Sequence, residues 1–206
     1  MIVRRTILLL FIVLLSGAPE SGAQSIVKGK GRFLVDVDIA RFFGDERQVY
    51  VEIYYGIHEN AISYVEKTGG LSGSVRMRLL VRTDSAVITN KEWLVPHEIT
   101  DSLRLSNAQI MTGIESLALP GGEYEVQLTA VDVNDPDRRD STVTKLPITA
   151  YPAATESMSD LELCTLIQSA TNKQSIFYKN TLEVTPNPAR LYGVGLPIMY
   201  SYVELY

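Results

Sequence analysis

Apolar and polar positions alternate with a period of two along most of the chain, whereas helical periodicity is nearly absent. The alternation predicts strands at 32–38, 47–55, 74–82, 86–89, 92–95, 123–133 and 141–149, with a less regular strand at 108–117. Clusters of Gly, Asn and Asp separate these short segments. This pattern is typical of an all-β antiparallel sandwich.

A local signal refines the predicted fold. The segment Leu119-Pro120-Gly121-Gly122-Glu123-Tyr124 places a tight turn before a strand and a tyrosine at the start of that strand. Immunoglobulin-type sandwiches often have a tyrosine at such a corner, where its hydroxyl bonds to nearby backbone. We therefore predict an immunoglobulin-like antiparallel β-sandwich over residues 24–150. The alternative is an ordinary turn followed by a core tyrosine.

The last quarter of the chain has a weaker pattern. Proline and small residues at 151–157 predict a linker. Residues 158–206 then predict a partial second β region, with a closing strand at 198–206. That strand either pairs with the preceding domain or opens a second sandwich that this chain does not contain.

The first 23 residues predict export. Arg4 and Arg5 precede an apolar run at 6–15, and Ser21-Gly22-Ala23 offers small residues at a cleavage site. The apolar run is shorter than the roughly 20 residues that a spanning helix needs, so a membrane anchor is the weaker alternative. We predict a cleaved signal peptide at 1–23, a periplasmic or extracellular location and no membrane insertion after cleavage.

Charge and cysteine content narrow the function classes. The net charge of −5 argues against a nucleic-acid partner, which would need clustered positive charge. The one cysteine, Cys164, cannot close an internal disulfide. Its apolar neighbours predict a buried packing residue, and the alternative is a reactive or intermolecular thiol.

The segment 132–140 is the densest polar cluster in the chain. We expect a solvated hairpin loop here, since Asn134, Asp135 and Pro136 are turn formers. Carboxylate and amide oxygens also suit calcium, which is the alternative. The segment lacks the central glycine and terminal glutamate of the twelve-residue calcium loop.

Catalytic patterns are few. The two histidines, His58 and His97, fall in expected loops and show no zinc-ligand spacing. The segment Gly70-Leu71-Ser72-Gly73 falls short of a nucleophile elbow, and no glycine-rich phosphate loop is present. We predict a non-enzymatic protein with no cofactor, metal or catalytic residues. A hydrolase with a serine triad built on either histidine ranks third among the candidate functions.

Aromatic residues suggest a binding surface. Tyr50 and Tyr54 lie on one face of a predicted strand, and Val49, Val51, Ile53 and Tyr55 lie on the other. Trp93 is the only tryptophan. Exposed tyrosines on a sheet could stack on sugars or contact a protein. The alternative is that this strand is buried on both faces, between its sheet and a neighbouring domain.

Several segments together resemble the N-terminal region of the GWxTD-domain proteins, a family of exported bacterial proteins. The segments are 49–55, 119–124, 132–135, 161–164, 178–180, 184–188 and 202–206. The motif that names the family is absent, because Trp93 is flanked by Glu92 and Leu94. The resemblance implies the leading sandwich region of a longer protein, and it supplies no catalytic residues.

These observations predict an exported β-sandwich module that acts in protein interaction or in envelope or surface assembly, with a protein as its partner. The alternative is a carbohydrate-binding module or an accessory domain of a secreted hydrolase.

Overall fold

The computed structural model describes residues 25–100, 109–152 and 155–206. The signal peptide predicted at 1–23 lies outside them. The described chain is almost entirely β. Its elements are β1 Ile26–Val27, β2 Val35–Phe43, β3 Gln48–His58, the short 3₁₀ helix η1 Glu59–Ala61, β4 Tyr64–Lys67, β5 Gly70–Arg82, β6 Val87–Ile99, β7 Ile110–Pro120, β8 Gly122–Asp132, β9 Arg139–Ile148, β10 Glu162–Ser169, β11 Tyr178–Lys179, β12 Leu182–Pro186 and β13 Tyr200–Tyr202.

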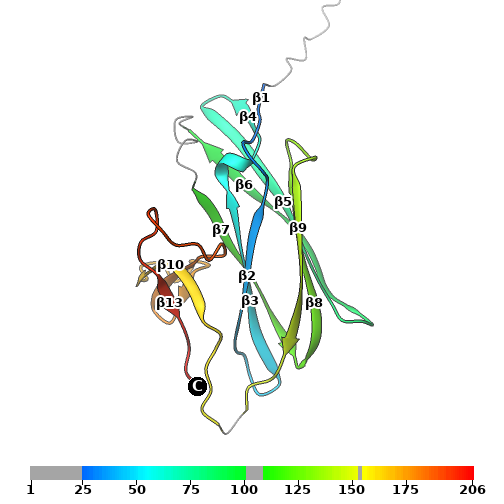
Figure 1. Ribbon diagram of the computed structural model, residues 1–206, viewed down its shortest axis with the longest axis vertical. Helices are drawn as coiled ribbons and strands as arrows, with labels where there is room; N and C mark the ends of the chain where they lie inside the picture. Colours follow the sequence, from blue (N-terminus) through cyan, green and yellow to red (C-terminus); the bar gives the residue numbers. More distant parts are fainter. Residues whose placement is uncertain (1–24, 101–108, 153–154) are drawn as a thin grey trace, which may run out of the picture.

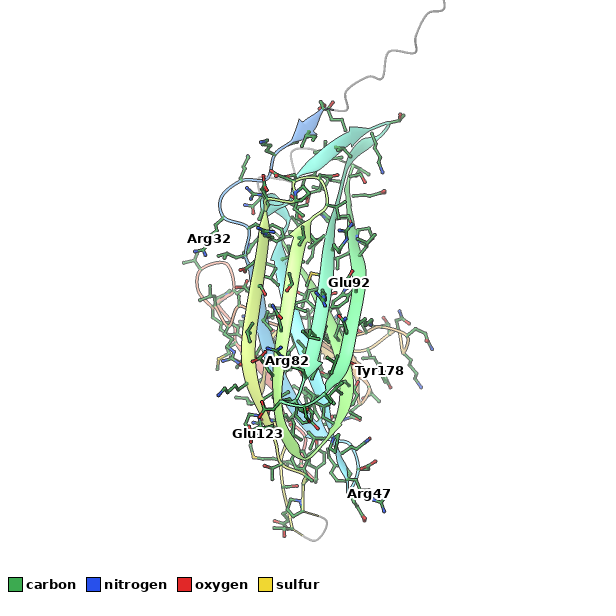
Figure 2. All side chains as sticks on the ribbon, turned by 90° about the vertical axis from the view of Figure 1, so that its right-hand side faces the viewer. Arg32, Arg47, Arg82, Glu92, Glu123 and Tyr178 are labelled. Carbon is green, nitrogen blue, oxygen red and sulfur yellow. The ribbon has the colours of Figure 1, made fainter. Side chains whose placement is uncertain are left out.

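Two antiparallel sheets form a sandwich, as the alternating pattern predicts. One sheet has the order β2-β3-β7. In the other, β5 lies between β6 and β8, and β9 pairs with β8. The short strands β4 and β1 extend this second sheet beside β5. Figure 1 shows the two sheets edge-on, and Figure 2 looks at the molecule from the side of the larger sheet, which carries Arg82 and Glu92.

The core lies between the two sheets and is built from the predicted inward faces. Val51 and Ile53 on β3 are fully buried, as are Val75 and Met77 on β5. Burying each such side chain is worth about 1.5–3 kcal/mol. A single hydrophobic core therefore holds the sandwich together without a disulfide.

Several strand boundaries differ from the prediction, and the closing strand predicted at 198–206 is only Tyr200–Tyr202. The segments 86–89 and 92–95 are one strand, β6, because β5 pairs with it along its whole length. Strand β2 runs to Phe43 rather than ending at Asp38, and beyond Asp38 both of its faces are covered, which hides the period-two pattern. Strand β4 was not predicted, since it is four residues long and only Tyr64 in it is buried.

A third antiparallel sheet, with the order β11-β12-β10-β13, covers the outer face of β2 and β3. It lies beside these strands in Figure 1. A second core fills this contact, and its buried members are Ala40, Phe42, Tyr54, Cys164, Val184 and Tyr202. The closing strand pairs with β10 and not with a strand of the sandwich. Strand β3 is therefore buried on both faces from Val51 to Ile57, which was the alternative to an exposed tyrosine face.

The end of the chain is tied to the connection between sandwich and third sheet. Tyr206 and Ser157 exchange two backbone hydrogen bonds of 2.9 and 3.1 Å. The Tyr206 ring packs against Phe43 and Tyr151, and the Tyr151 hydroxyl donates to the backbone oxygen of Arg41. These contacts fix the third sheet against the end of β2.

Candidate functional site

A buried ionic cluster lies where the third sheet meets the sandwich. The Lys179 ammonium on β11 contacts one carboxylate oxygen of Glu52 on β3 and one of Glu162 on β10, each at 2.5 Å. It also donates to the Tyr54 hydroxyl at 3.1 Å. The side chains of Lys179 and Glu52 are each 8% exposed, and that of Glu162 is 1% exposed. One cation therefore faces two carboxylates in a site that is nearly closed to water.

The surroundings of this cluster are aromatic and unevenly hydrogen-bonded. The Lys179 ammonium lies 4.4 Å from the ring centroid of Phe42 and 5.3 Å from those of Tyr54 and Tyr202. Burial raises the pKa of Glu162, and the nearby ammonium only partly opposes this effect. The second oxygen of Glu162, Oε1, is buried and has no hydrogen-bond partner in the described structure.

Lys179 lies next to a strained hairpin turn that positions it in the cluster. Asn180 and Thr181 connect β11 to β12 with φ of 46° and 74°. This left-handed region is unfavourable for a β-branched residue. The Asn180 amide donates to the Tyr202 hydroxyl at 2.7 Å and to Glu204 at 3.0 Å. These hydrogen bonds hold the turn and direct Lys179 inward.

A small open pocket of about 280 Å³ lies above the cluster. Its aromatic lining is Phe42, Phe43, Tyr50 and Tyr178, and its polar lining is Glu52, Lys179, Asn180 and Glu204. Tyr50 is 39% exposed at this pocket, whereas Tyr54 from the same strand face is 1% exposed. Only one of the two tyrosines proposed as a binding face is therefore accessible.

Exposed apolar side chains lie on and beside the outer face of the third sheet. Glu162 and Cys164 on β10 and Tyr202 on β13 point toward the sandwich, so the residues between and beside them point outward. Met158 and Leu205 pair across the same edge. We call this surface the outer apolar face, and it comprises Met158, Leu161, Leu166, Met199, Val203 and Leu205, with exposures from 38% to 79%.

The other two aromatic candidates belong to the sandwich core. Tyr55 is buried, and Trp93 packs against that core with its indole N–H donating to the Tyr55 hydroxyl at 3.3 Å. Their rings lie 5.9 Å apart. Neither ring is free to serve as a stacking platform on the sheet surface.

The polar segment 132–140 contains the expected hairpin connection, between β8 and β9, but some of its polar side chains are not solvated. Asp132 is fully buried, and its carboxylate accepts from the backbone N–H of Ser63 at 2.7 Å and of Asn134 at 2.9 Å. The Arg138 guanidinium donates to the backbone oxygen of Ala61. The segment instead ties β8 and β9 to the chain around η1. Among the described residues, no group of three or more His, Cys, Asp or Glu is arranged to hold a metal ion.

The histidines lie in strands and not in the loops that we expected. His58 ends β3 and has Nε2 3.7 Å from a carboxylate oxygen of Asp36. His97 lies within β6, 3.3 Å from an oxygen of Glu59. The segment 70–73 is the start of β5 and pairs with the end of β6. It therefore lacks the strand-to-helix turn of a nucleophile elbow.

Cys164 is the buried packing residue that its neighbours predict. It is fully buried in the second core, and burial raises the pKa of its thiol to about 12. The thiol donates to the backbone oxygen of Glu162. The sequence did not predict the ionic cluster next to Cys164. Its members Glu52, Glu162 and Lys179 come from three separate segments of the chain.

No family model, curated protein or solved structure matches this chain. Within the described residues, no helix is long and apolar enough to cross a membrane.

Proposed function

We propose that this protein is an exported, non-enzymatic β-sandwich module that binds a protein partner in the bacterial envelope or at the cell surface. The outer apolar face of the third sheet is the surface that makes this contact. The predicted signal peptide and the resemblance to the N-terminal region of GWxTD-domain proteins support the export of this protein.

The distribution of exposed apolar side chains carries this proposal. Of the twenty large apolar side chains that are exposed in the described structure, ten lie in the short segment 158–206, and six of these ten form the outer apolar face. Scattered apolar residues are normal on a protein surface, but a contiguous apolar patch is typical of an interaction site. The outer face of the larger sandwich sheet is more polar, with charged residues such as Arg78 and Glu92 paired across β5 and β6.

We further propose that the sandwich is immunoglobulin-like. Its seven long strands, lettered A to G in chain order, divide into the sheets A-B-E and D-C-F-G. The Tyr124 hydroxyl donates to the backbone oxygen of Pro120 at 2.9 Å, at the corner before strand F, which is the tyrosine-corner arrangement. Strand D lies beside C here, whereas constant-type domains place it with A, B and E.

In-cell photo-crosslinking tests the proposed function. A photoreactive residue at Met199 should give a discrete adduct with an envelope protein, whereas one at Thr129, on the outer face of the larger sheet, should not. The adduct should disappear when Leu161→Glu is added, provided that circular dichroism still shows the β fold. Equal adducts from both positions, or an adduct that survives Leu161→Glu, would refute the outer apolar face as the binding surface.

A carbohydrate-binding function is the second candidate, and the pocket above the ionic cluster favours it. The pocket combines aromatic walls with carboxylate and amide groups, and aromatic rings provide stacking surfaces for a ligand. Glycan-array binding that is lost with Tyr50→Ala and kept with the exposed control Val143→Ala would support this function. Absence of glycan binding by the wild-type protein would exclude it for the glycans tested.

A further inference from the structure

We propose that Lys179 and Glu162 form an intramolecular isopeptide bond, an amide between the Lys179 Nζ and the Glu162 Cδ, with Glu52 moving the proton. This inference is independent of the proposed function. It concerns only the buried cluster between sandwich and third sheet.

The reacting groups are already in contact. The Lys179 Nζ lies 2.5 Å from Oε2 of Glu162, and that oxygen is bonded directly to the Cδ that would be attacked. Holding the two reacting groups in contact makes their reaction effectively unimolecular. Contacts to Glu52 and Tyr54 also direct the ammonium, so its orientation is fixed by groups from β3 and β10.

The environment suits a lysine nucleophile. The Lys179 side chain is 8% exposed, and the rings of Phe42, Tyr54 and Tyr202 surround its ammonium. Desolvation in an apolar pocket is one of the ways in which proteins activate a lysine amine. The attacking species is the neutral amine, so a nearby group must first accept a proton from the ammonium.

The two glutamates are distinguished by their hydrogen bonds. Oε2 of Glu52 accepts from both the Tyr54 hydroxyl, at 2.6 Å, and the Lys179 ammonium. In the described part of the chain, Oε2 of Glu162 accepts from the ammonium, and its buried Oε1 has no hydrogen-bond partner. Burial raises the pKa of Glu162, which favours the neutral acid and hence a better acyl group than a carboxylate. Glu52 is therefore the proton acceptor, and Glu162 is the acyl donor.

The proposed step balances without any co-reactant. Glu52 takes one proton from the ammonium, and the freed amine attacks Cδ of the neutral Glu162 acid. The resulting tetrahedral carbon loses its hydroxyl group as water when Glu52 returns a proton to it. The nitrogen loses its remaining extra proton to Glu52, so one C–N bond forms and one C–O bond breaks. No electron transfer occurs, and the net products are one amide and one water molecule, with Glu52 left protonated.

The bond would join β10 to β11 beneath the contact with β3. The described residues contain one free cysteine and thus no disulfide that could serve this purpose. A covalent cross-link here would fasten the strained hairpin of Asn180 and Thr181 onto the sheet that carries the outer apolar face.

Intact-mass spectrometry of the purified, exported protein tests the bond, with the N-terminus defined by sequencing. The mass should be lower than the sequence mass by one water molecule. A proteolytic digest should contain a branched peptide that joins the segment around Glu162 to that around Lys179. Lys179→Met and Glu52→Gln should restore the full sequence mass. The exposed control Lys145→Met should keep the deficit of one water.

A wild-type mass equal to the full sequence mass would overturn the proposal, and this result does not depend on the folding of any variant. A branch at Glu52 in place of Glu162 would overturn the assigned roles, as would a Glu52→Gln variant that folds and still loses water.

Discussion

Replacement of Asp132 should destabilise the sandwich far more than replacement of an exposed residue in the same polar segment. The carboxylate is fully buried and accepts two backbone N–H groups, from Ser63 and Asn134. Asp132→Ala removes both acceptors and leaves these donors unpaired. A buried donor without a partner costs about 1–3 kcal/mol, so we expect a loss of about 4 kcal/mol in the free energy of unfolding.

For a domain of this size, each kcal/mol lowers the melting temperature by about 2–4 °C. Thermal unfolding followed by circular dichroism should therefore show Asp132→Ala melting about 8–16 °C below wild type. Asp137→Asn is the matched control, because Asp137 is exposed in the same segment, and surface changes usually stay within about 0.5 kcal/mol. Millimolar calcium should leave the wild-type melting temperature unchanged, since backbone N–H groups already occupy the Asp132 carboxylate.

Two results would refute this reasoning. An Asp132→Ala melting temperature equal to that of Asp137→Asn would mean that the two hydrogen bonds do not hold the segment. A calcium-dependent rise in the wild-type melting temperature would mean that the acidic segment binds calcium, because a ligand that binds only the folded state stabilises it.

Three further predictions follow from packing and burial. Ile53→Ala, at a fully buried position, should lower the free energy of unfolding by about 2–5 kcal/mol, as measured by denaturant unfolding. A loss below about 1 kcal/mol would contradict the described core. Tyr124→Phe should lower the free energy of unfolding by about 0.5–1.5 kcal/mol, because it removes only the hydrogen bond to Pro120. An unchanged free energy of unfolding would show that this hydrogen bond is not formed. Cys164 in the native protein should resist alkylation up to pH 9, because burial raises the pKa of its thiol to about 12. It should react once the protein is unfolded. Rapid labelling of the native protein would contradict the burial of Cys164.

The sequence pattern was sufficient for the sandwich because each of its main strands buries one face. Val75 and Met77 alternate with Arg76 and Arg78 along β5, and a period of two identifies such a strand directly. The pattern fails where a second layer covers the other face. On β3, Glu52 and Tyr54 occupy positions that look solvent-facing but lie under the third sheet.

The ionic cluster could not be predicted for a related reason. Its members come from β3, β10 and β11, and nothing in the spacing of Glu52, Glu162 and Lys179 along the chain brings them together. Likewise, Asp132 and Arg138 look like residues of a solvated turn, and only their long-range partners Ser63 and Ala61 give them structural roles. Long-range contacts of this kind leave no periodic signal in a single sequence.

The central claim is that a partner covers the outer apolar face in the cell, and thiol labelling of Leu205→Cys tests it most directly. Because the native Cys164 is buried, it should contribute little labelling of its own. Thr129→Cys on the larger sheet is the control. We predict that a small maleimide labels both positions rapidly in the purified protein, but that in intact cells the cysteine at position 205 is protected and the one at 129 is not. Equal labelling of both positions in cells would contradict the claim.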